Sequence, residues 1–220
     1  MAAESAAGGG SPGTARGSAR RRPARPREEV LAESMAAIAE HGLSGLTMAA
    51  LGRRLGMSGG HLLYYFGSKD RLLLETLQWS EGQLGEDRRA IVGRPPGPPA
   101  AALLAEYAAL YLPDGPGDPR WVLWLEVWNR SSASTELRAG AQEIADTWHR
   151  DLVALVRRGA AEGGFRATPL PEPDGWSARY AALLDGLAVG VVTALPGASR
   201  KAALAHAAAY VADTLSPSSG

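Results

Sequence analysis

Cysteine is absent from this 220-residue sequence, and lysine occurs only twice among its 23 basic residues. Without cysteine there can be no disulfide scaffold, no thiolate metal site and no cysteine nucleophile. The four histidines are scattered without i, i+4 pairing, so we expect no metal site. The sequence also lacks a glycine-rich loop after a strand. We therefore expect a protein that is not an enzyme, with no catalytic residue and no cofactor.

Long apolar runs are lacking as well. The longest, residues 180–195, contains Asp185 and is too short to span a bilayer. The N-terminal stretch has no apolar segment of the kind that a secretory signal needs. We expect a cytoplasmic protein with no membrane partner.

The net charge of zero hides an asymmetry between the N-terminal stretch and the rest. Residues 1–27 hold six arginines and one acidic residue, Glu4. Residues 1–24 lack helical periodicity and are predicted to be a disordered arm. Its charge favours a polyanionic partner, with four arginines as candidate DNA contacts: Arg20, Arg21, Arg22 and Arg25. The alternative is a merely solubilising segment.

From residue 27 onward the apolar residues recur at helical spacing, and no stretch shows the alternation of a strand. The pattern predicts an all-α protein with eight or nine helices. Gly42 is expected to end the first helix. The later helices are expected at 47–55, 58–66, 68–84, 100–112, 118–132, 134–162, 173–195 and 199–215.

Two short helices flank a tight turn at Gly56 and Met57, which is the pattern of a helix-turn-helix. Thr47, Ser58 and Ser68 stand where N-caps of successive helices belong. Apolar residues hold the second helix against the first and leave its opposite face free. A face of this kind enters the major groove of double-stranded DNA.

The order Thr-x-x-x-Leu-x-x-x-Leu-Gly-Met-Ser-x-Gly-x-Leu-x-Tyr-Tyr-Phe-x-Ser-Lys resembles the DNA-binding half of the TetR (tetracycline-repressor) family, from about Val30 to Leu74. The resemblance implies phosphate contacts from Thr47, Tyr65 and Lys69, with Tyr64 as a second aromatic candidate. Together with the residues at the turn and on the recognition helix, the candidate DNA-binding set is Thr47, Met48, Ser58, Gly59, Gly60, His61, Tyr64, Tyr65 and Lys69.

This sequence departs from the family pattern on the recognition helix. Gly59 has no side chain for a base, Ala49 replaces an arginine that sometimes reads bases, and Leu63 stands where tyrosine is common. Direct readout is then left chiefly to His61, Met48 and Tyr64, and the arginine arm is expected to compensate by entering the minor groove. An alternative for the glycines is a close helix crossing.

The body, residues 73–220, follows an arm at 1–24 and a DNA-binding domain at 25–72. Stripes of small and apolar residues on its last two helices favour a homodimer interface built around a two-fold axis. The candidate interface residues are Ala182, Gly186, Gly190, Leu204, Ala208 and Val211. The alternative is that both stripes pack inside one subunit.

Aromatic residues concentrate in the body. They predict an apolar pocket for a small-molecule effector, with Glu126 or Asn129 as polar groups. The candidate ligand-binding residues are Tyr107, Tyr111, Trp121, Trp124, Trp128, Trp148 and Trp176. The alternative is that these side chains form an ordinary core.

Together these patterns predict a TetR-type transcriptional regulator, a repressor that binds a palindromic operator as a dimer and is released by a ligand. One alternative is a ligand-independent regulator or activator. Another is a helical binding protein or enzyme with an incidental helix-turn-helix.

Overall fold

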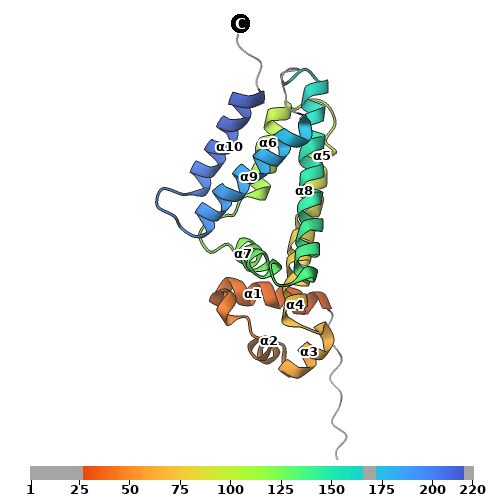
Figure 1. Ribbon diagram of the computed structural model, residues 1–220, viewed down its shortest axis with the longest axis vertical. Helices are drawn as coiled ribbons and strands as arrows, with labels where there is room; N and C mark the ends of the chain where they lie inside the picture. The colour runs from red at the N-terminus through yellow and green to blue at the C-terminus, as the bar shows by residue number, and fades with distance from the viewer. Residues whose placement is uncertain (1–26, 166–171, 216–220) are drawn as a thin grey trace, which may run out of the picture.

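The computed structural model describes residues 27–165 and 172–215, and these segments are all-α, as predicted from the sequence (Figure 1). They contain ten helices and no strand. The ten are α1 (Arg27–Gly45), α2 (Met48–Leu55), α3 (Gly59–Phe66), α4 (Lys69–Gln83), α5 (Gly85–Val92), α6 (Ala100–Tyr111), α7 (Pro119–Ser131), α8 (Thr135–Ala161), α9 (Pro173–Val192) and α10 (Arg200–Leu215). The predicted arm lies outside the described residues.

The count of eight or nine helices was too low. The segment after α4 continues as a separate helix, α5, because the chain leaves α4 at Leu84 and resumes a helix at Gly85. The first helix also differs from expectation. Gly42 does adopt a positive φ of 66°, but helical turns resume after it and α1 extends to Gly45.

Helices α1 to α3 form one end of the molecule (Figure 1). Their shared core is apolar and includes Ile38, Leu51, Leu62 and Phe66, each no more than 2% exposed. Helix α4 begins at this end and packs on both α1 and the body helices α7 and α8. It therefore runs through the boundary predicted at residues 72 and 73 and connects the two regions.

The body is organised around α8, whose 27 residues extend for about 40 Å. Helix α8 packs against α4, α6, α7 and α9, and α10 packs on α6 and α9 (Figure 1). Within the part of the chain that the structure describes, no helix is long and apolar enough to cross a membrane.

Candidate DNA-binding surface and effector cavity

Helices α2, α3 and α4 each start with the capping residue predicted for them. The Thr47 hydroxyl accepts a hydrogen bond from Ala50 N, and the Ser58 hydroxyl accepts one from His61 N, both at 3.0 Å. Ser68 likewise caps α4. Each cap satisfies an N–H group that the first turn leaves without a helical partner. The predicted caps are confirmed, and they fix where α3 starts relative to α2.

Two glycines allow the close approach of α2 to the turn and to α3. A Cβ atom on Gly52 would lie 2.7 Å from Met57 O, and one on Gly59 would lie 3.2 Å from Met48 O. Gly59 thus packs against the backbone of α2. This contact fits the close helix crossing that was the alternative for the glycines. Gly60, in contrast, is exposed and has open space around it.

The outward face of α3 carries His61, Leu63 and Tyr64. Tyr64 is 90% exposed, whereas Tyr65 is half-buried and packs edge-on against Phe66 with ring centroids 5.2 Å apart. The two tyrosines therefore differ in role, because Tyr64 alone presents its whole ring to solvent. Met48 is half-buried at the start of α2.

Basic side chains near this face differ in their surroundings. Arg53 on α2 is exposed. Arg54 pairs with Glu33 and Glu40 on α1. Lys69 is half-buried in the first turn of α4. Arg20, Arg21, Arg22 and Arg25 lie outside the described residues.

The first described residue, Arg27, lies beside α3. Its guanidinium carbon is 5.0 Å from the Tyr65 ring centroid and 4.6 Å from that of Phe66, and its guanidinium group pairs with Glu75. The predicted arm is therefore attached next to the C-terminal end of the recognition helix.

A cavity of about 320 Å³ lies in the body between α6, α8 and α9. Its walls combine three aromatic rings, two carboxylates and several smaller groups: Tyr107, Tyr111, Gln142, Ala145, Asp146, Trp148, His149, Leu152, Ala181, Leu184 and Asp185. The volume is at the small end of the usual range for ligand pockets, which fits a compact ligand.

The aromatic groups of this cavity are held in fixed positions. Tyr107 donates a hydrogen bond to Trp148 O at 2.7 Å, and Tyr111 donates one to Asp185 Oδ1 at 2.5 Å. The rings of both tyrosines meet Trp148 edge-on, with centroids 5.3 and 5.0 Å apart. Burial raises the pKa of Asp185, while the bond from Tyr111 opposes that shift. No arginine or lysine lines the cavity, whose two carboxyl groups are those of Asp146 and Asp185.

Four of the aromatic residues predicted for the pocket lie elsewhere. Trp176 packs with Tyr180 and Tyr210 between α9 and α10, and its indole N–H donates to Thr214. Trp121 donates to Tyr111 O. Trp124 is buried between helices, and Trp128 is 38% exposed at the surface of α7. The three indoles of α7 share one face of that helix, where they pack on one another, on Tyr111 and on Glu81 without lining the cavity.

Residue Glu81 was missed by the sequence analysis. It is 4% exposed and accepts hydrogen bonds from two indoles, Trp124 Nε1 at 2.7 Å and Trp148 Nε1 at 2.8 Å. Arg120 adds a third donor at 3.2 Å. One carboxylate thereby joins α4, α7 and α8, and one of its donors, Trp148, is also a wall of the cavity.

The polar groups of the cavity were missed too. Glu126 pairs with Arg130 rather than facing the cavity, and Asn129 is exposed on α7. The signal for Asp185 was present in the sequence as the single charge in an apolar stretch. No signal in the sequence marked Glu81, because a glutamate near a helix end is usually exposed to solvent.

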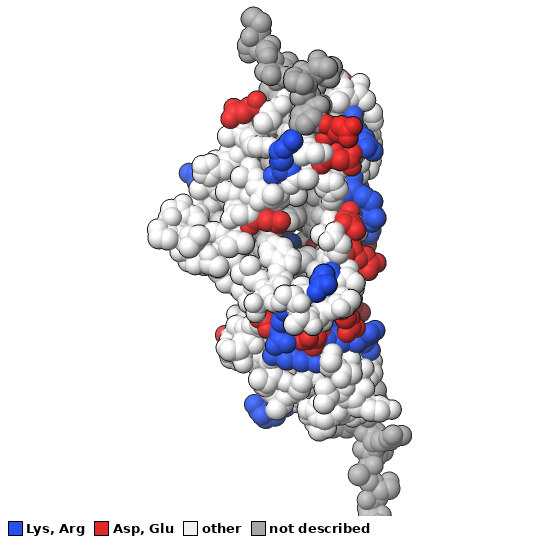
Figure 2. All heavy atoms as spheres, in the orientation of Figure 1, with Lys and Arg blue, Asp and Glu red and all other residues white. Residues whose placement is uncertain are grey.

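The small-residue stripes divide between the interior and the surface. Gly190 and Val211 are buried inside the subunit, where a Cβ on Gly190 would lie 3.4 Å from Ala198. They are corrected to intrasubunit packing positions, because α9 and α10 pack on each other. Ala182, Gly186 and Ala208 remain exposed, Leu204 is half-buried, and few charged side chains lie over the α9–α10 loop (Figure 2).

Fold and geometry together define a helix-turn-helix DNA-binding protein with a ligand-sized cavity in a helical body. Comparison with known families gives the same class. Residues 30–76 match the model described as bacterial regulatory proteins of the tetR family, and residues 100–216 match that of the C-terminal part of BetI-type transcriptional repressors. The chain belongs to the TetR family of transcriptional regulators, with a body of the BetI type.

Similar proteins include the HTH-type transcriptional regulator BetI of Burkholderia mallei, 27% identical over 191 residues that cover 87% of this chain and 94% of the relative. A solved transcriptional regulator from Saccharomonospora viridis, in complex with choline, is 26% identical with a TM-score of 0.76, covering 87% of this chain and 97% of that one. A TetR regulator from Haloarcula marismortui, 20% identical with a TM-score of 0.71 and covering 86% and 97%, shares the fold.

Proposed function

We propose that this regulator is a homodimeric repressor whose operator affinity is lowered by a small quaternary-ammonium cation, choline being the first candidate. The observation that carries the effector class is the cavity: three aromatic rings surround a space that ionised Asp185 makes anionic. Aromatic faces attract such cations through the ring quadrupole, and a carboxylate adds a charge–charge attraction. The choline complex of the S. viridis relative supports the same class.

At the DNA end, the caps and basic groups around α3 contact the phosphates in this proposal. The N-termini at Thr47 and Ser58 present N–H groups to phosphate oxygens, and Tyr65 and Lys69 add side-chain contacts. Base edges are read by Met48, Gly60, His61 and Tyr64. Gly59 is left out because it packs against α2.

The arginine arm supplies further contacts in the minor groove in this proposal. Arg25 is two residues from Arg27, so its Cα lies within about 7 Å of a residue that touches α3. From there Arg20, Arg21 and Arg22 reach the groove beside the one that α3 enters.

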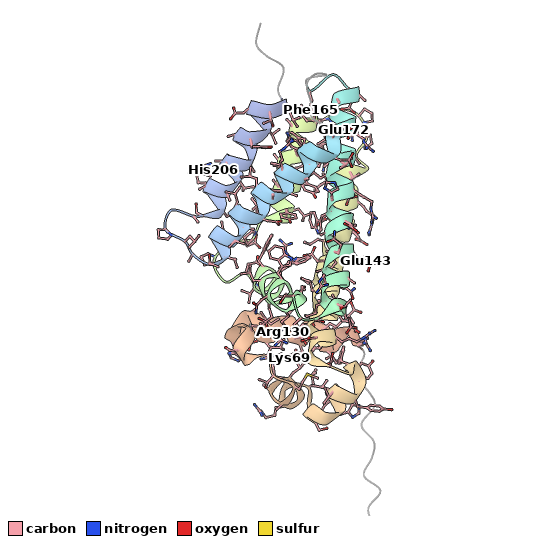
Figure 3. All side chains as sticks on the ribbon, in the orientation of Figure 1. Lys69, Arg130, Glu143, Phe165, Glu172 and His206 are labelled. Atoms are coloured by element: carbon pink, nitrogen blue, oxygen red, sulfur yellow. The ribbon has the colours of Figure 1, made fainter. Side chains whose placement is uncertain are left out.

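The dimer forms through the exposed part of α9 and α10 in this proposal. Ala182, Gly186 and Ala208 provide small side chains for close helix approach, and Leu195 is an exposed apolar residue beside them. A hollow lined by Gly186, Leu195 and His206 of α10 (Figure 3) gives the second subunit a surface to fill. A two-fold axis here puts two recognition helices in successive major grooves, about 34–36 Å apart.

Communication between the two ends runs through α4 in this proposal. A cation against Trp148 displaces the indole that donates to Glu81, and Glu81 belongs to the helix that starts at Lys69 beside α3. Ion pairs such as Arg71–Glu136 and Arg130–Asp70 cross the junction, where charged side chains form a band in Figure 2 and Figure 3 labels Arg130. Such pairs contribute only about 0–1 kcal/mol each, so a ligand can shift them. The free energy by which a ligand shifts the equilibrium between two conformations equals the difference in its binding free energy for the two.

The test of the effector is a titration of the full chain with choline, followed by calorimetry and by the fluorescence of Trp148 and the other indoles. We expect saturable binding of choline, and none of its neutral isostere 3,3-dimethyl-1-butanol at the same concentration. Asp185→Asn keeps an acceptor for Tyr111 and removes the charge, so affinity for choline falls by about tenfold or more. Binding of the neutral alcohol as tightly as choline contradicts the cation assignment.

The test of the regulator is genomic footprinting followed by mobility shifts of the bound sites. Choline is expected to release the operator. Specific operator binding that no quaternary ammonium compound affects favours a ligand-independent regulator or activator. The absence of any sequence-specific binding at physiological salt favours a binding protein with an incidental helix-turn-helix.

A further inference from the structure

The outward face of α3 is apolar. Leu63 is 48% exposed and Tyr64 is 90% exposed, and they are neighbours on the recognition helix. Only two other large hydrophobic residues in the described segments are exposed, Trp128 and Leu195, and both lie in the body. Half of the exposed large apolar groups therefore lie on one turn of the one helix that faces DNA.

Charged side chains are scarce beside them: His61 is the polar side chain on the same face, and Arg53 of α2 is exposed. Helix α3, Gly59–Phe66, contains no charged residue, and its two glycines offer no side chain. Arg54 on α2 is held by two glutamates of α1. The commonest specific contact in the major groove, an arginine or lysine bonded to guanine, therefore has no donor on the recognition helix itself.

We infer that Leu63 and the ring of Tyr64 recognise the C5-methyl groups of thymines in the operator half-site. The thymine methyl is the apolar group that the bases display in the major groove, and its burial is the readout available to an apolar face. Open space around Gly60 lets the backbone of α3 come close to the bases, which brings the short Leu63 side chain within reach. The inference rests on the proposed placement of α3 in the major groove.

The experiment replaces thymine by deoxyuridine, which lacks only the methyl group. An operator is first selected from a random duplex library with the full chain, and each thymine of one half-site is then replaced singly. At the positions that α3 reads, we expect about fourfold weaker binding per methyl removed. In Leu63→Ala or Tyr64→Ala, binding to the thymine operator falls, and the corresponding deoxyuridine substitution causes no further loss.

Trp128→Ala is the matched control, since it removes an exposed apolar side chain from the body, outside both α3 and the proposed dimer surface. It should retain the full fourfold sensitivity to deoxyuridine. A specific operator that binds equally well with deoxyuridine at every position overturns the inference while the regulator function stands. So does an unchanged deoxyuridine effect in both α3 variants. Failure to select any sequence contradicts specific recognition itself, and the inference with it.

Discussion

The DNA-binding end and the body differ in how their functional residues are brought together. At the DNA-binding end, the caps, the glycine crossing and the exposed face of α3 all fall within residues 47–69. In the body, the cavity is made of residues from three helices. Its hydrogen bonds Tyr107–Trp148 and Tyr111–Asp185 join residues 41 and 74 positions apart. A local pattern can encode the first arrangement, while the second exists only after the helices have packed.

The two regions also differ in the contacts that hold their helices together. Backbone proximity at Gly52 and Gly59 sets the helix-turn-helix, whereas a buried carboxylate at Glu81 holds α4, α7 and α8 together. Substitutions at these positions should therefore show which contacts each region depends on.

The largest effect is expected from Glu81→Leu. The substitution removes a buried acceptor from two indole N–H groups and from Arg120. We expect the free energy of unfolding to fall by about 3–5 kcal/mol, as measured by urea denaturation. Glu86→Leu, at an exposed position of α5, should change it by less than about 0.5 kcal/mol. Equal effects of the two substitutions would show that Glu81 does not organise the body.

The next effect is expected from Gly52→Ala at the DNA-binding end. The added Cβ meets Met57 O at 2.7 Å and Gly59 N at 3.0 Å, both backbone atoms, so α3 has to move. We expect a loss of about 1–3 kcal/mol in stability and a clear fall in operator affinity, with choline affinity unchanged. Gly82→Ala in α4 is the control, because its Cβ meets no atom within 4 Å and the residue lies outside the helix-turn-helix. If Gly52→Ala binds operator like the wild type, the glycine crossing does not position α3.

These contrasts explain what the sequence could and could not predict. The fold class, the three N-caps and the helix-turn-helix followed from local patterns, since caps and glycine turns depend on neighbouring residues. The cavity did not: seven aromatic residues were proposed, but only Tyr107, Tyr111 and Trp148 line it. The indoles of α7 pack on Tyr111 and Glu81 instead, and periodicity along one helix does not determine such tertiary contacts.

A smaller, graded effect is expected from pH. Burial places the pKa of Asp185 above its ordinary value of 3.8. Choline affinity should therefore begin to fall at a higher pH than an exposed aspartate would give, by at most about tenfold per pH unit below that pKa. Calorimetry across this range is the measurement. Asp146 and His149 also line the cavity, so Asp185→Asn serves as the reference, and its affinity should depend less on pH. An identical pH profile in both proteins contradicts the role of Asp185.

The smallest effect on the effector is expected from Trp128→Ala. Its ring meets Trp121 edge-on and Trp124 at a tilt, with centroids 6.0 and 5.4 Å away, but does not line the cavity. We expect stability to fall by about 1 kcal/mol and choline affinity to stay within about twofold of the wild type. Trp148→Phe should instead weaken choline binding, because it alters the cavity wall and removes the donor to Glu81. If both substitutions weaken choline binding equally, the indoles of α7 belong to the effector site, and residues along one helix face predict a binding site after all.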